Sequence, residues 1–167
     1  MGMELIGRRL SSDEWRAVLN DPEAVGALLY GDLDDDDAEM PDPELDLGKS
    51  WHALHYLLTG SAWGFGDGVV GAVILGGVEI GEDGGYGPAR LFGPEAVRAV
   101  ATELDALDVE SLRTRYDADA MANAEIYPGG CTNDGAEFDD LVVHLVELRQ
   151  FYRTAADNDQ AVLLAVT

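Results

Sequence analysis

The pattern of hydrophobic and polar positions along the chain predicts strands near both ends and helices between them. The segment MELIGRRL, from Met3, is predicted to form the first strand, and the β-branched, apolar segment QAVLLAVT closes the chain as the last. Two short apolar runs, AVILGG from Ala72 and ARLF from Ala89, are further strand candidates. Glycines bound the first of these runs, which is typical of a buried strand.

Apolar residues repeat at helical spacing in the segments between these strands. Ser11 and Glu14 have the spacing of a capping box, and Pro22 and Pro94 stand where a helix tolerates proline, in its first turn. A shorter helix is predicted to follow through Leu112 and Tyr116, and the longest from about 135 to 156. The apolar faces of the other helices comprise Trp15, Val18, Leu19; Val25, Leu28, Leu29; Val97, Val100, Ala101, Leu104, Leu107; and Phe138, Leu141, Val142, Leu145, Leu148, Tyr152. These elements favour one α/β domain, residues 1–167, around a small mixed sheet.

The segment DLGKSWHALHYLLTG, from Asp46, contains Gly-Lys-Ser and two histidines three residues apart. Pro43 stands where a phosphate-binding loop needs its first glycine, so a nucleotide site is not predicted. A helix is predicted instead, with Asp46 as its N-cap and Gly60 as its stop. Its apolar stripe would hold Leu47, Trp51, Leu54 and Leu58, its border His55 and Thr59, and the opposite side Lys49, His52 and Tyr56.

The charge of the chain narrows the classes of partner. Of 167 residues, 33 are acidic and 10 basic, which gives a formal net charge of -23. Such a surface repels phosphate backbones and anionic lipid headgroups, so neither nucleic acid nor a membrane is an expected partner. The acidity fits a solubilising surface, a docking surface for a basic protein, or mimicry of DNA, and net charge does not separate these three.

The expected location is the cytoplasm. No apolar run reaches the roughly 18 residues that cross a bilayer, and the N-terminus lacks the apolar region of a signal peptide. The single cysteine, Cys131, excludes an internal disulfide framework.

The acidic residues concentrate in residues 31–46, GDLDDDDAEMPDPELD, which are predicted to form a solvated loop. Asp32, Asp34 and Asp36 have the spacing of an EF-hand. Asp37 and Pro43 replace its glycine and its bidentate glutamate, so calcium is not expected.

Other motifs are weak. Gly66, Gly68 and Gly71 form a GxGxxG pattern that leads into a predicted strand, whereas a dinucleotide site needs a helix there. The two histidines of the 46–60 segment have no cysteine or carboxylate at ligand spacing, so no metal is predicted. Cys131 is a thiol nucleophile only if His144 or His55 serves it, and the sequence does not fix that geometry. No cofactor is expected.

Three segments in order, LDLGKSWHALHYLLTG, GYGPARLFGPEAV and EIYPGG, resemble the YfbM-like bacterial family of unknown function. The resemblance covers nearly the whole chain and implies a three-layer α/β sandwich with helices on both faces of the sheet, and no activity. This sequence departs from the family pattern in its acidic loop and in GSAWGFGDGVVG. The matched residues are Lys49, Trp51, Leu54, His55, Thr59, Gly60, Gly87, Pro88, Ala89, Arg90, Glu125, Ile126, Tyr127 and Pro128.

The polar residues among these matched positions form the candidate binding site: Lys49, His55, Thr59, Arg90, Glu125 and Tyr127. Lys49 is the only lysine beside nine arginines, which suggests a position where a compact ammonium matters. Arg90 is expected to pair with Glu125 or to bind a carboxylate or phosphate. His55 is also explained as a hydrogen-bonded residue at the edge of the core.

Two functions remain open. The sequence favours a non-enzymatic binding module for a protein partner or a small ligand, because it lacks nucleophile–base and metal motifs. The alternative is a small hydrolase or transferase in which His55 is a general base oriented by Glu125, with Arg90 or Lys49 stabilising an anion. The two differ in whether these residues converge in an open pocket.

Overall fold

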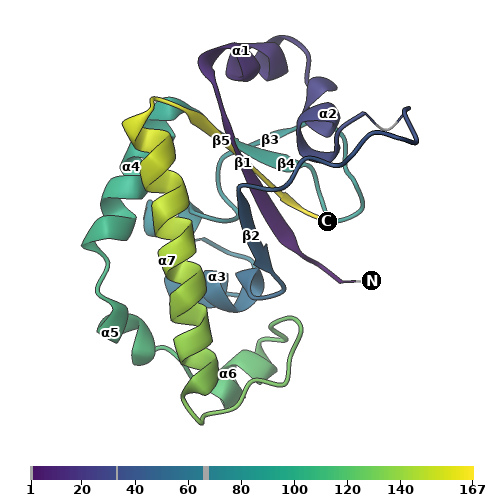
Figure 1. The fold of residues 1–167 in the computed structure, drawn as a ribbon. Helices are drawn as coiled ribbons and strands as arrows, with labels where there is room; N and C mark the ends of the chain where they lie inside the picture. The colour runs from purple at the N-terminus through teal and green to yellow at the C-terminus, as the bar shows by residue number, and fades with distance from the viewer. Residues whose placement is uncertain (1, 33, 66–67) are drawn as a thin grey trace.

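The fold was analysed in a computed structural model that describes residues 2–32, 34–65 and 68–167 (Figure 1). Gly66 of the glycine pattern lies outside these residues. The strands are β1 (Leu5–Leu10), β2 (Leu45–Gly48), β3 (Val78–Ile80), β4 (Ala89–Phe92) and β5 (Ala161–Val166). The helices are α1 (Ser12–Asn20), α2 (Ala24–Tyr30), α3 (Trp51–Thr59), α4 (Pro94–Ala106), α5 (Val109–Arg113), α6 (Ala118–Asn123), α7 (Ala136–Asp157) and the 3-10 turn η1 (Val70–Ala72).

The five strands form one sheet in the order β2-β1-β5-β4-β3. Every neighbouring pair is antiparallel, so the expected mixed sheet is wrong in its strand directions. The two terminal strands predicted from the sequence pair along their whole lengths, from Leu5 opposite Val166 to Leu10 opposite Ala161. The first and last strands therefore lie side by side in the interior of the sheet.

Helices cover both faces of the sheet, as the three-layer prediction requires (Figure 1). Successive side chains of a strand point to opposite faces. In β5, Val162 and Leu164 join the larger apolar cluster with α3, α4 and α7, whereas Leu163 and Ala165 join the smaller cluster with α1 and α2. All four are buried, because this strand is covered from both sides.

Several helix ends follow directly from the sequence. Ser11 caps α1 with the predicted capping box, in which its hydroxyl accepts from the Glu14 N–H and the Glu14 carboxylate accepts from the Ser11 N–H. Pro94 occupies the first turn of α4. The longest helix runs over 136–157, one residue from its predicted start and end. The shorter helix predicted through Tyr116 ends at Arg113, and α6 was not predicted.

The apolar run from Ala72 does not form a strand. It contains the 3-10 turn η1, and Val73 and Ile74 are buried in the larger cluster without sheet pairing. The backbone carbonyl of Val73 accepts a hydrogen bond from the Tyr152 hydroxyl at 2.7 Å, so a side chain of α7 satisfies a group that a strand would have paired. The glycines at both ends pack closely: a side chain on Gly71 would clash with the backbone of Phe65.

The segment from Asp46 begins as a strand rather than a helix. Leu45–Gly48 pairs with β1, and the Asp46 carboxylate accepts from the N–H of Gly48 at 2.8 Å instead of capping a helix. The helix α3 starts at Trp51, after Ser50. Trp51, Leu54 and Leu58 are buried as predicted. His52, which was expected on the opposite side, is also fully buried, because the segment after α3 folds back over it.

Residues 34–44 of the acidic segment contain turns but no helix or strand, and the last two residues of the predicted loop belong to β2. Asp32 and Asp35 accept hydrogen bonds from backbone N–H groups two residues further on, at 3.0 Å each. These local turns use the carboxylates without an ion. Within the described part of the chain, no group of three or more His, Cys, Asp or Glu residues is arranged to hold a metal.

Candidate functional site

The two histidines of α3 are structural hydrogen-bonding groups. His52 Nε2 donates to the Ala62 carbonyl at 2.8 Å, and its Nδ1 accepts from the Tyr127 N–H at 3.0 Å, which fixes a neutral ring. His55 Nε2 lies 3.0 Å from the Gly64 carbonyl. Burial lowers the pKa of His55 to about 4. Both rings therefore anchor the segment after α3.

Thr59 has a similar role at the end of α3. Its hydroxyl donates to the His55 carbonyl at 2.8 Å and accepts from the Ser61 N–H at 3.0 Å. The hydrogen bonds close the turn that follows Gly60, whose φ of 75° suits glycine. His55 and Thr59 thus belong to one structural junction.

Lys49 and Tyr127 meet at the N-terminal segment. The Tyr127 hydroxyl accepts from the Met3 N–H at 3.3 Å. A side-chain carbon at Gly2 would come within 2.6 Å of Lys49 Cε and 2.8 Å of the Tyr127 hydroxyl oxygen. Both side chains therefore lie against the chain start, where Tyr127 forms the hydrogen bond and Lys49 is exposed.

Arg90 does not pair with Glu125. Its partner is Glu79, at 3.1 Å and directly opposite on β3, because the β3–β4 register brings the two residues side by side. The Glu125 side chain is exposed just beyond α6. Arg90 lines a cavity of only about 40 Å³. The structure therefore brings Lys49 and Tyr127 together but gives Arg90 and the His55–Thr59 junction separate surroundings.

The thiol of Cys131 lacks the surroundings of an activated nucleophile. The residue is half-buried, and burial raises the pKa of its thiol, with the nearby Glu137 carboxylate adding to the shift. A higher pKa reduces the thiolate fraction at neutral pH.

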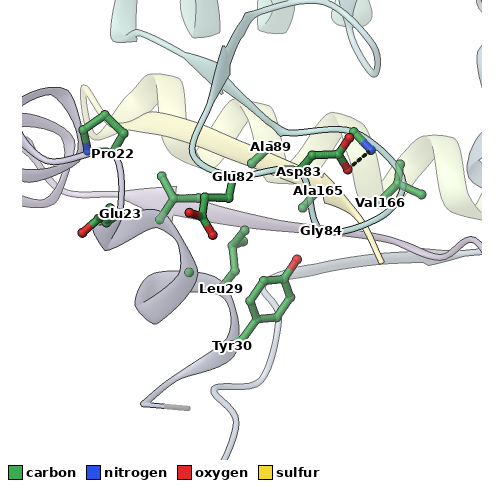
Figure 2. Close-up of a pocket in the computed structure, with 13 residues that line it drawn as sticks. Pro22, Glu23, Leu29, Tyr30, Glu82, Asp83, Gly84, Ala89, Ala165 and Val166 are labelled. Atoms are coloured by element: carbon green, nitrogen blue, oxygen red, sulfur yellow. Dashed lines mark hydrogen bonds between the residues drawn. The ribbon is translucent and has the colours of Figure 1, made fainter. Parts of the chain in front are cut away.

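A pocket of about 410 Å³ lies elsewhere, between α2 and residues 81–87 of the connection from β3 to β4 (Figure 2). We call it the α2 pocket. None of the six predicted site residues belongs to its lining, which comprises Pro22, Glu23, Val25, Gly26, Leu29, Tyr30, Glu82, Asp83, Gly84, Gly87, Ala89, Ala165 and Val166. Its floor is the sheet: Ala89 of β4 and Ala165 of β5 belong to the smaller apolar cluster. Short side chains on these strands leave space under α2.

The wall that α2 contributes contains a glycine in the first turn of the helix, as the third of its seven residues. A glycine inside a helix is less favourable than alanine by about 0.5–1 kcal/mol. Gly26 has no left-handed conformation that would explain it, and a methyl group added there would meet no atom within 4 Å. Its effect in this structure is to leave the pocket wide at the helix wall.

The opposite wall is an ordered loop with a negative charge. The Asp83 carboxylate accepts from the N–H groups of Gly85 at 2.7 Å and Gly87 at 2.9 Å. These hydrogen bonds lower the pKa of Asp83. Glu82 extends from the loop toward α2, and Glu23 stands at the start of α2 (Figure 2).

Tyr30 completes the wall opposite Glu82. Its ring stands at the end of α2 and its hydroxyl points toward the 81–87 loop (Figure 2). Partial burial raises the pKa of the Tyr30 hydroxyl, so it remains a neutral donor and acceptor. It makes no hydrogen bond to the part of the chain that the structure describes. The pocket thus combines an apolar floor, three carboxylates and one hydroxyl.

A second depression, of about 650 Å³, lies between α1, α4 and β4. Its lining is mostly apolar, with Trp15 and Phe92, and Glu95 is its one charged side chain. A ligand site usually adds a few polar groups that fix orientation. The α2 pocket has such groups and is the better candidate.

Comparison with known proteins assigns the family. The model of a domain of unknown function, DUF1877, matches residues 1–165. The chain belongs to the DUF1877 family. The structure is similar to that of a protein of unknown function, YfbM from Escherichia coli, with a TM-score of 0.79 and 22% sequence identity over 99% of this chain and 100% of that one. This likeness confirms the predicted YfbM-like fold. No curated protein matches the chain.

Proposed function

We propose that this member of the DUF1877 family is a non-enzymatic cytoplasmic binding module, whose α2 pocket receives a group of a protein partner or a small ligand. Gly26 is the observation that carries the proposal. A glycine within a helix lowers helix stability, and Gly26, in the first turn of α2, keeps open a pocket that a larger residue would narrow.

The lining of the pocket supports binding. Apolar groups from Val25, Leu29 and Ala165 offer a surface that displaces water, and Tyr30 and Glu82 offer polar groups that orient a ligand. The acidic surface disfavours nucleic acid and anionic membranes as partners. No helix in the described ranges has the length and apolar character needed to span a bilayer.

The alternative of a hydrolase or transferase has less support. A general base must reach the proton that it removes, and His55 is 1% exposed with Nε2 bonded to the Gly64 carbonyl. Arg90, the proposed anion-stabilising group, pairs with Glu79 on a different strand. The proposed catalytic set therefore does not assemble around His55.

The test is a fragment screen against the folded protein, with cationic, neutral and anionic fragments detected by ligand-observed NMR. Gly26→Leu fills the pocket, and Ala27→Leu places the same side chain at the neighbouring exposed position as a control. We expect fragments that bind the wild type and the control but are lost in Gly26→Leu. If no fragment of any charge depends on position 26, the binding function of this pocket is wrong.

A further inference from the structure

We propose that the α2 pocket receives a lysine or arginine side chain of a basic polypeptide, and that residues 34–44 of the acidic segment attract the same polypeptide. The inference rests on the proposed function, because it specifies what the pocket binds. Its basis is charge complementarity: three carboxylates and no basic side chain line the pocket.

The pocket fits the two-part chemistry of a long cationic side chain. Lysine and arginine carry an aliphatic stem that prefers apolar surface and a charged head that prefers carboxylates or water. Val25, Leu29 and Ala165 provide the apolar surface, and Glu82 and Glu23 stand on the two walls of the opening. A neutral or anionic group would leave these carboxylates partly desolvated without a partner.

The Asp83 hydrogen bonds prepare this arrangement before a ligand arrives. Two backbone N–H groups hold the Asp83 carboxylate within its own loop, and they keep it ionised by lowering its pKa. The adjacent Glu82 has no ion-pair partner within the described ranges of the chain and is exposed. Glu82 is therefore the carboxylate free to meet a cation, while Asp83 fixes the loop and adds to the negative potential.

The acidic segment argues for a polypeptide rather than a small amine. It leaves α2 directly after Tyr30, a residue of the pocket wall, and extends away from the sheet (Figure 1). Asp34, Asp35, Asp36 and Asp37 are exposed and form no ion pair with any described residue. At physiological ionic strength the electric field of these exposed charges extends about 8–10 Å, which is longer than the contact distance between a carboxylate and one bound ammonium group. A basic chain can use both the pocket and this field.

The two features should act at different stages of binding. Exposed charges outside a pocket mainly accelerate encounter, whereas contacts in a desolvated pocket mainly slow dissociation. Replacing Asp34–Asp37 by asparagine should lower the association rate several-fold and weaken its salt dependence. Gly26→Leu should instead raise the dissociation rate about tenfold or more.

The experiment uses pools of random nine-residue peptides, each pool with one amino acid fixed at the central position. Peptides retained by the immobilised full-length protein are quantified by mass spectrometry. We expect the lysine and arginine pools to be enriched at least fivefold over the citrulline and norleucine pools. The enrichment should disappear in Gly26→Leu and in the double variant Glu23→Gln/Glu82→Gln. A control variant, Glu103→Gln/Asp140→Asn, loses the same charge from the α4 and α7 side and should keep it.

Four outcomes test the inference, and the last of them tests the proposed function as well. Equal enrichment in the two charge-matched double variants would show that general acidity attracts basic peptides, and would overturn the pocket assignment. Binding that depends on Gly26 but favours neutral or acidic pools would overturn the cationic ligand and leave the proposed function intact. If butylguanidinium alone binds as tightly as the best peptide, a small cation replaces the polypeptide. Failure of every fragment and pool to depend on Gly26 would instead refute the proposed function itself.

Discussion

The two faces of the sheet differ in how their side chains pack. On one face, α3, α4 and α7 bury the larger apolar cluster, which includes Phe92, Leu164 and Tyr152. On the other, the two short helices α1 and α2 bury the smaller cluster, in which Ala89 and Ala165 stand on the same two central strands. Large side chains pack against the helices of the first face, apart from the depression of about 650 Å³ beside α1 and α4. On the other face, small side chains leave a pocket of about 410 Å³.

The difference suggests a division of labour within one domain. Protein interiors are close-packed, and the face that holds most of the buried apolar surface contributes most to stability. The face that carries α2 can then tolerate an unfilled space, acidic side chains and a helix glycine. The larger apolar cluster and the proposed binding pocket lie on opposite sides of β4 and β5, so we expect that each can change with little effect on the other.

The largest expected contrast comes from the same substitution on the two faces. Leu148→Ala, in α7, should lower the free energy of unfolding by about 4 kcal/mol. Leu148 is 0% exposed, so its truncation leaves a closed cavity. Leu29→Ala, in α2, should lower it by about 2 kcal/mol, because the space joins an existing pocket. Urea denaturation measures both. Equal losses would contradict the division of labour.

As the pH falls, protonation of His55 should destabilise the face with the larger cluster before protonation of Asp83 affects the pocket loop. The pKa of His55 falls from 6.5 unfolded to about 4 folded, mainly by burial. Unfolded chains then bind more protons between these values, so this group's stabilising effect is complete above pH 6.5 and is lost as pH falls toward 4. The loss should reach up to about 3 kcal/mol.

The comparison variant is His55→Gln, which keeps a donor for the Gly64 carbonyl but does not titrate. Denaturation between pH 7 and 4 should show that the wild type loses stability relative to this variant. On the pocket face, Asp83 has a pKa below 3.8, so its hydrogen bonds to the loop persist to lower pH. Parallel pH profiles for wild type and His55→Gln would contradict the buried neutral ring.

The sequence predicted the packed face better than the pocket face. The apolar repeats of α4 and α7 and the two terminal strands contribute much of the larger cluster, and the sequence pattern identifies these elements, although not that the two strands pair. The run from Ala72 was mispredicted because periodicity does not reveal that Tyr152 would take the hydrogen bond of Val73. Strand direction also depends on connections that a local pattern does not encode.

The pocket residues were missed because none belongs to a chemical motif. Glu82 and Glu23 are two of 33 acidic residues, and only the fold brings the start of α2 to the 81–87 loop. One sequence signal was available: Gly26 interrupts an apolar helix, where a glycine costs stability relative to alanine. The predicted residues His55 and Arg90 attracted attention as polar groups, although the structure uses both in local bonds.

Gly26→Ala, a smaller change than Gly26→Leu, tests whether the glycine lowers the stability of the protein while it widens the α2 pocket. It should raise the free energy of unfolding by about 0.5 kcal/mol, the lower end of the range for helix interiors, because Gly26 is in the first turn and the added methyl group meets no atom within 4 Å. The reverse substitution, Ala27→Gly, should lower it by a similar amount. Thermal denaturation of the pair measures both effects. A destabilised Gly26→Ala would show that the glycine is needed for the backbone rather than for the pocket.

The smallest effect on stability is expected where the pocket face extends into the acidic segment. Replacing residues 33–43 by a Gly/Ser linker should leave the melting temperature within a few degrees, or raise it by easing charge repulsion, because the described residues there are largely exposed and bury little apolar surface. Differential scanning calorimetry measures the change, and a linker that keeps all its aspartates but replaces Pro41 and Pro43 separates charge from chain stiffness. The same deletion should weaken binding of basic peptides at low salt. A cooperative loss of folding would mean that the segment supports the sheet, and its attraction for a partner would then need testing by asparagine substitutions alone.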